Sequence, residues 1–264
     1  MPRDKLDRET AARVESQLPA VSEVRRASLA LQPDIISAYF PQGSLIPIAT
    51  VCFQDATCAL EEARYALLEA LAHVVWNREK RKPANEMEAA FFGKFYSDDA
   101  AVRIYAAGEH LANGIVNMLD IRTEVTQYKQ QIKGKNIVSK QALVGSYLIE
   151  NYPDLELTKA LLRLKQSDEW KKTRTYRDAW VHGKPPIIKD VGIGYERRNR
   201  LKVTADSIGI TVGGGDEPHY SVDELLGFTK PALTLLIQAV AVAVQTYSKV
   251  LDERKNGQTL FASA

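Results

Sequence analysis

The chain has only two cysteines among its 264 residues, Cys52 and Cys58. Five residues separate them, a spacing that matches neither a zinc knuckle nor a disulfide framework. A chain of this length buries most of its apolar surface and does not depend on such cross-links for stability. We therefore expect two small buried hydrophobic residues in a reducing compartment.

The sequence also has no long apolar run near its start, so we expect no signal peptide. Its longest uncharged stretch, residues 231–248, contains a proline and two glutamines. Such a length is at the lower limit for crossing a bilayer. We expect this stretch to form a buried core helix of a cytoplasmic protein without membrane contact; a membrane span is the alternative.

Motifs for common cofactors are missing as well. Gly192 and Gly194 lack the third glycine of a dinucleotide fingerprint, and the glycines at 213–215 are not followed by the Lys-Ser/Thr of a phosphate loop. The four histidines show no metal-ligand spacing such as His-Glu-x-x-His. We expect neither a metal nor a cofactor.

What is present is a helical pattern with an uneven charge distribution. The net charge is only +2, but residues 159–202 contain thirteen Lys or Arg against five Asp or Glu, a local balance of +8. Such a stretch suits an anionic partner such as RNA, although a solvated helix face with incidental lysines is the simpler explanation of charge alone.

Apolar spacing predicts a mainly α fold built around a four-to-five-helix bundle. We expect short helices over 4–17, 21–39 and 139–151 and long ones over 56–80, 98–120, 155–182 and 222–255. Ser97 is the expected N-cap of the second long helix, and Ser221 with Glu224 forms a capping box before the last.

Between the last two long helices the pattern changes. Residues 201–212 contain two β-branched runs and predict a small β-hairpin insertion, part of a β excursion over about 190–215. We divide the chain into an N-terminal arm, residues 1–54, packed on a helical bundle formed by residues 55–264.

One short segment, Arg177-Asp178-Ala179-Trp180-Val181-His182, is typical of a catalytic site. On a continuous α-helix Arg177 and His182 would point about 140° apart. Pro185 and Pro186 prevent the helix from continuing, so His182 is expected in the last turn, where its side chain can approach Arg177. A histidine that transfers protons beside an arginine that binds phosphate is a suitable pair for cleaving a phosphodiester.

This segment resembles the Arg-x4–6-His motif of the HEPN superfamily, and the helical layout extends the resemblance over about 55–257. Asp178 matches the polar residue that often follows the arginine in that family. The resemblance implies a metal-independent endoribonuclease, in which the RNA 2′-hydroxyl is the nucleophile. It also implies a homodimer that brings two Arg/His pairs into one groove, and a toxin or defence role with an antitoxin or regulatory protein as partner.

The chain departs from one HEPN subgroup, which commonly has tyrosine two residues after the histidine, where this chain has Lys184. An antitoxin of that subgroup is therefore not assumed. Within the ribonuclease hypothesis, Arg177, His182 and Asp178 form the catalytic group. The residues expected to guide the RNA backbone are Lys171, Lys172, Arg174 and Lys184.

Simpler roles exist for the same residues. Arg177 can pair with Asp178 or Glu169 on the helix surface, His182 can cap the last carbonyls, and Asp178 can be solvated or orient Arg177. Trp170, Tyr176 and Trp180 can stack on bases or pack in the core. Two alternative functions follow: a non-catalytic RNA- or nucleotide-binding module of the same fold, and a helical protein-interaction domain.

Overall fold

The computed structural model describes residues 3–132, 139–183, 185–189, 191, 201–204, 207–210 and 218–255. Over these residues the chain is mainly helical, as the sequence predicts. The elements in chain order are η1 (Arg3–Lys5), α1 (Arg8–Glu15), α2 (Ser22–Ala30), α3 (Pro33–Tyr39), α4 (Ile46–Val75), η2 (Trp76–Lys80), α5 (Glu86–Leu119), α6 (Arg122–Gln131), α7 (Lys140–Asn151), α8 (Glu156–Gln166), α9 (Asp168–His182), β1 (Leu201–Thr204), β2 (Ser207–Ile210) and α10 (Val222–Lys255).

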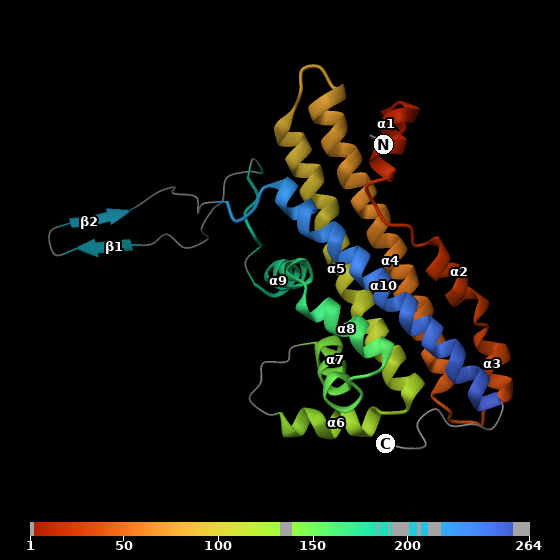
Figure 1. Ribbon diagram of the computed structural model, residues 1–264. Coiled ribbons are helices and arrows are strands. Elements are labelled where there is room, and N and C mark those ends of the chain that lie inside the picture. The colour runs from red at the N-terminus through yellow and green to blue at the C-terminus, as the bar shows by residue number, and fades with distance from the viewer. Residues whose placement is uncertain are drawn as a thin grey trace.

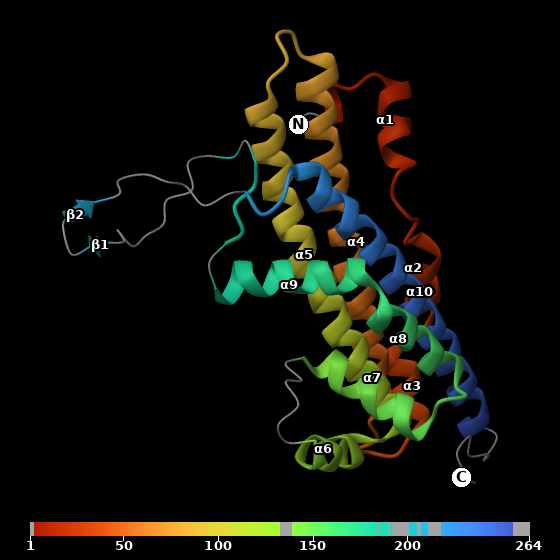
Figure 2. The same ribbon diagram turned by 60° about the vertical axis from the view of Figure 1, so that its left-hand side comes forward.

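Helices α4 and α5 form a long antiparallel hairpin, and α10 runs obliquely along it (Figure 1). Helices α1 to α3 follow the outer side of α4, whereas α8 and α9 cover α10 and α5 on the opposite side. Helix α9 crosses α5 near the middle of its length, with α7 and α6 stacked beyond it (Figure 2). This crossing positions the residues of the predicted motif.

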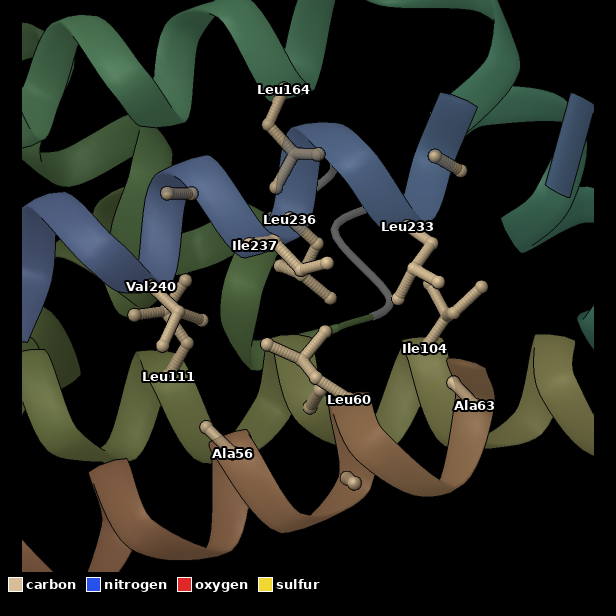
Figure 3. Packing of buried hydrophobic residues seen from close by; sticks show 14 of the residues in the cluster. Ala56, Leu60, Ala63, Ile104, Leu111, Leu164, Leu233, Leu236, Ile237 and Val240 are labelled. Atoms are coloured by element: carbon tan, nitrogen blue, oxygen red, sulfur yellow. The ribbon is translucent and has the colours of Figure 1, made fainter. Parts of the chain in front are cut away.

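The core lies where α4, α5, α8 and α10 meet (Figure 3). Leu60 of α4, Ile104 and Leu111 of α5, Leu164 of α8 and Leu233 of α10 are all fully buried there. Helix α10 is long and apolar enough to cross a membrane by length and composition. However, 56% of its most apolar window is buried inside the fold, as expected for a core helix.

The N-terminal helices pack on α4, but the boundary expected at residue 54 falls inside that helix. Helix α4 begins at Ile46 because Pro47 lies in its first turn, where the missing N–H of proline needs no partner. Pro33 starts α3 in the same way and divides the single helix expected over 21–39. The amide of Gln54 donates to the Leu31 carbonyl at 2.8 Å and links α2 to α4.

Other expected boundaries also need correction. Helix α5 begins at Glu86, where the Asn85 side chain caps it by accepting from the Glu88 N–H at 3.0 Å. Ser97 is therefore not an N-cap but a buried residue inside the helix. Helix α6 was not expected, because its sequence is mostly polar. Of the two cysteines expected to be buried, Cys58 is exposed and Cys52 is partly exposed.

The long helix expected over 155–182 is two helices. Ser167 has extended backbone angles (φ −61°, ψ 132°), and its hydroxyl accepts from the Trp170 N–H at 3.1 Å, so it ends α8 and caps α9. Only this change of direction lets α9 cross α5. A serine N-cap of this kind stabilises the N-terminus of a helix by about 1 kcal/mol.

The segment between α9 and α10 contains two short strands. β1 and β2 pair antiparallel, with Leu201 opposite Ile210. The capping box predicted before α10 is confirmed: the Ser221 N–H donates to Glu224 Oε2 at 2.7 Å, and the Glu224 N–H donates to the Ser221 hydroxyl at 3.2 Å.

Helices α4 and α5 approach each other closely at Gly114. A Cβ at this position would lie 2.5 Å from the ring of Phe53, whereas a Cβ at Gly145 of α7 would meet nothing within 4 Å. We expect Gly114→Ala to lower the free energy of unfolding by about 1–3 kcal/mol through overpacking. Gly145→Ala should leave it unchanged or raise it by up to about 1 kcal/mol. Urea unfolding of both variants tests this, and equal shifts would contradict it.

The protein should become less stable as the pH is lowered, because of His73. Its ring is buried and stacks against the rings of Phe92 and Tyr96, and burial lowers its pKa from 6.5 to about 4. Between these values the unfolded chain binds a proton that the folded chain does not, so the free energy of unfolding decreases as the pH falls. We expect a loss of about 1–3 kcal/mol between about pH 7 and pH 4.5. Urea unfolding at several pH values tests this. In His73→Phe the free energy of unfolding should change less with pH, whereas in the control His110→Ala it should change as much as in the wild type.

Candidate functional site

One face of α9 is buried and determines where the motif lies. Trp170, Thr173 and Tyr176, three residues apart, are each at most 3% exposed. The Trp170 ring packs on Gly108 of α5, where an added Cβ would be 3.2 Å from it. The Thr173 hydroxyl faces the Phe228 carbonyl of α10 at 3.4 Å. Trp170 and Tyr176 are thus core residues and do not offer stacking faces.

Tyr176 is the polar anchor of this face. Its hydroxyl donates to Asp98 of α5, and Lys94 pairs with the same carboxylate at 2.5 Å. Burial raises the pKa of Tyr176 far above its usual range, and the negative charge of Asp98 adds to this effect. The Tyr176 ring also contacts the rings of Tyr220 and Phe228. A neutral phenol paired with a buried carboxylate therefore joins α9 to α5, one residue before Arg177.

Arg177 lies between α9 and α5. Its guanidinium carbon is 4.0 Å from the centroid of the Tyr105 ring, a cation–π contact. Its Nη1 donates to Asp178 at 3.0 Å, and the same atom is 3.2 Å from His182 Nε2. The Arg177 side chain is only 16% exposed. Its pair with Asp178 is therefore not the solvated surface ion pair considered as the simpler alternative. Arg177 is held at a fixed position in a low-dielectric setting.

His182 is the last residue of α9, and Gly183 caps the helix through an N–H bond to the Ala179 carbonyl at 3.1 Å. The helix ends where the two prolines predicted, and the imidazole reaches Arg177 across the last turn. A guanidinium can only donate, so Nε2 must accept, which requires a neutral imidazole with its proton on Nδ1. The exposed His182 ring thus presents an acceptor nitrogen to Arg177.

The hydrogen bonds of the Arg177 guanidinium are incomplete. Its Nε is buried and has no hydrogen-bond partner among the described residues. The ring that contacts this guanidinium belongs to Tyr105. Burial raises the pKa of Tyr105 and the charge of Glu109 raises it further, whereas the positive charge of Arg177 lowers it. An unpaired buried donor costs about 1–3 kcal/mol. Because this donor is buried, it lowers stability and does not by itself offer a hydrogen bond to a ligand.

The residues expected to guide RNA lie at different places. Arg174 is three residues before Arg177 and so lies on the same side of α9, and its positive charge slightly opposes the rise in the pKa of Tyr105. Lys171 instead donates to Asp168 and to the Gln166 carbonyl. The positive charge of Lys172 contributes to the lowered pKa of Glu224. Both lysines point at least about 120° away from Arg177 around the helix. Lys184 lies outside the described residues.

The remaining histidines have structural or solvent contacts. His73 stacks against the rings of Phe92 and Tyr96, and His110 lies 3.9 Å from Asp55. His219 is exposed and accepts the Ile187 N–H at 3.1 Å. In the described part of the chain, no group of three or more His, Cys, Asp or Glu side chains is arranged to hold a metal ion.

Sequence reasoning missed Tyr105 and Asp98. Both lie on α5, more than 70 residues before the motif, and reach it only because α9 crosses α5. Neither has a local sequence signal, since each occupies an ordinary position of an amphipathic helix. Trp180, by contrast, is 39% exposed beside His182 and is available to a ligand or partner.

No family model matches this chain, and neither a curated protein nor a solved structure matches it. The functional interpretation therefore depends on the arrangement of residues around Arg177.

The anchor of α9 can be tested by removing one hydroxyl. Tyr176→Phe leaves the Asp98 carboxylate, itself 8% exposed, without its phenol donor. We expect the free energy of unfolding to fall by about 1–3 kcal/mol. Tyr128→Phe is the matched control, because the Tyr128 hydroxyl bonds to Glu150, which water can reach. Its loss should be smaller, and equal losses in urea unfolding would argue against a special role for Tyr176.

Proposed function

We propose that this protein is a metal-independent endoribonuclease of HEPN type, with Arg177 and His182 as the catalytic pair. The supporting observation is the 3.2 Å contact between Arg177 Nη1 and His182 Nε2 at the end of α9. Two residues that a continuous helix would separate by about 140° are adjacent at the one place where the helix ends.

The reaction follows from these groups. A phosphate that binds Arg177 competes for the guanidinium donors and releases His182 Nε2 to accept the proton of the RNA 2′-hydroxyl. The 2′ oxygen attacks phosphorus and the bond to the 5′ oxygen breaks, which leaves a 2′,3′-cyclic phosphate. The departing 5′ oxygen takes a proton from water or from the imidazolium of a second copy. Arg177 stabilises the charge that develops on the phosphate.

Asp178 has a positioning role in this proposal. Its carboxylate accepts from Arg177 Nη1 at 3.0 Å, on the same nitrogen that faces His182. The bond holds the guanidinium plane, and Tyr105 supports that plane from below. Arg174 shares this face and adds positive charge where an RNA backbone would approach.

A homodimer is part of the proposal. Trp180 and Val181 are 39% and 40% exposed directly before His182, and such apolar residues next to a polar site suit a contact with a second copy. A second Arg/His pair would supply the proton for the leaving group. The toxin or defence role, and an antitoxin or regulatory partner, belong to the proposal through the resemblance alone.

The test is RNA cleavage in EDTA by the wild type, His182→Ala and Arg177→Ala. We expect either substitution to lower the rate by about 10²–10⁴-fold, since each removes a group that acts in the transition state. Wild-type products should end in 2′,3′-cyclic phosphate. His110→Ala removes a partly exposed histidine outside the motif and should retain full activity.

Cleavage that needs added divalent metal and persists in His182→Ala would contradict the proposal. Equal RNA binding by both proteins without cleavage by either would instead support a non-catalytic binding module. The absence of any salt-dependent RNA binding would favour a protein-interaction domain. Sedimentation of the active preparation tests the dimer, which full activity in a monomer would exclude.

A further inference from the structure

A cavity of about 330 Å³ lies between α5, α6 and α7. Its polar lining consists of Arg122, Thr126, Lys129, Ser139 and Lys140, and its apolar lining includes Val116 and Leu143. No described lining residue is acidic. Three cations and two hydroxyls around one hollow form an environment suited to a phosphate group.

The three cations are available to different extents. Arg122 donates one bond to Asn117 Oδ1 at 3.0 Å, which orients the guanidinium and leaves other N–H groups open. Lys140 contacts the Asn113 carboxamide oxygen. Lys129 is exposed and makes no hydrogen bond or ion pair with the described part of the chain. The pocket thus combines two positioned cations with one unpaired cation.

One acidic group close to the pocket is already engaged in hydrogen bonds. Glu109 of α5 accepts the backbone N–H groups of Lys140 and Gln141, each at 3.2 Å, at the start of α7. Its charge therefore offsets the helix dipole and the two amides. A ligand in the pocket would be bound by the side chains of Arg122, Lys129 and Lys140, and not by the helix end.

The pocket and the Arg177 site lie on one stripe of α5. Tyr105, Glu109, Asn113 and Val116 fall within about 80° around the helix, because each is three or four residues from the next. Tyr105 to Val116 spans about 16 Å at 1.5 Å per residue. In Figure 2 the end of α9 and the start of α7 lie on the same side of α5.

We propose that this pocket binds a backbone phosphate of the RNA strand whose cleavage is assigned to Arg177 and His182. A span of about 16 Å corresponds to four or five stacked nucleotides at about 3.4 Å each, and to fewer in an extended strand. The pocket is a distal subsite that fixes the strand away from the scissile bond. This inference rests on the proposed function for the identity of the strand.

The test is binding of labelled RNA to Arg122→Gln/Lys129→Gln in a His182→Ala background, which prevents cleavage. We expect affinity for a 12-nucleotide RNA to fall about tenfold, since two charge-assisted contacts are lost. The slope of log affinity against log salt should decrease by about 0.7 for each phosphate contact removed. A dinucleotide cannot reach both sites, so its affinity should change by less than about twofold.

Lys159→Gln/Lys249→Gln is the matched control, because it removes two exposed lysines from α8 and α10. Equal losses in both double variants would overturn the subsite, since the effect would be one of net charge. Binding of inorganic phosphate that depends on Arg122 and Lys129, without any dependence on RNA length, would also overturn it in favour of a small phosphate ligand. Failure of the proposed function is distinguishable: the wild type would not cleave, while the length-dependent RNA binding would persist.

Discussion

Packing of α9 across α5 positions every group of the candidate site. The Tyr176 hydroxyl bonds to the buried Asp98 carboxylate, and the Trp170 ring rests on Gly108. With these two contacts at either end of its buried face, α9 has one orientation and little freedom to rotate. Arg177 then points onto Tyr105, and its side chain can be 16% exposed yet still reach His182. The site chemistry is a consequence of this interhelical contact.

The low exposure of Arg177 changes what its charge can do. A guanidinium in water is screened, and surface pairs such as Arg177–Asp178 are worth little. Here the aromatic ring excludes water from one side, so the attraction to a phosphate is stronger. The buried Nε has no described partner, which lowers stability, but a ligand does not reach it in this arrangement.

Helix α5 links the two ends of the proposed RNA path. It contributes Tyr105 beneath Arg177, Glu109 at the start of α7 and Val116 in the pocket formed with α6. A rigid helix in the core keeps these positions at a constant spacing. Loops could not do so, because their ends move independently. The same helix is held against α4 by the close approach at Gly114, so the spacing depends on core packing.

The sequence alone determined the helical class, the last helix with its capping box, and the end of α9 at His182, because apolar spacing, caps and prolines act over a few residues. Local signals were misleading at Ser97, which resembles a cap but is buried in α5, and at Ser167, whose break was not recognised. Only the tertiary structure decided that Tyr105 supports Arg177, that Tyr176 bonds to Asp98, and that Lys171 points elsewhere. Those outcomes depend on how α9 crosses α5, and a crossing is set by the packing of residues far apart in the chain.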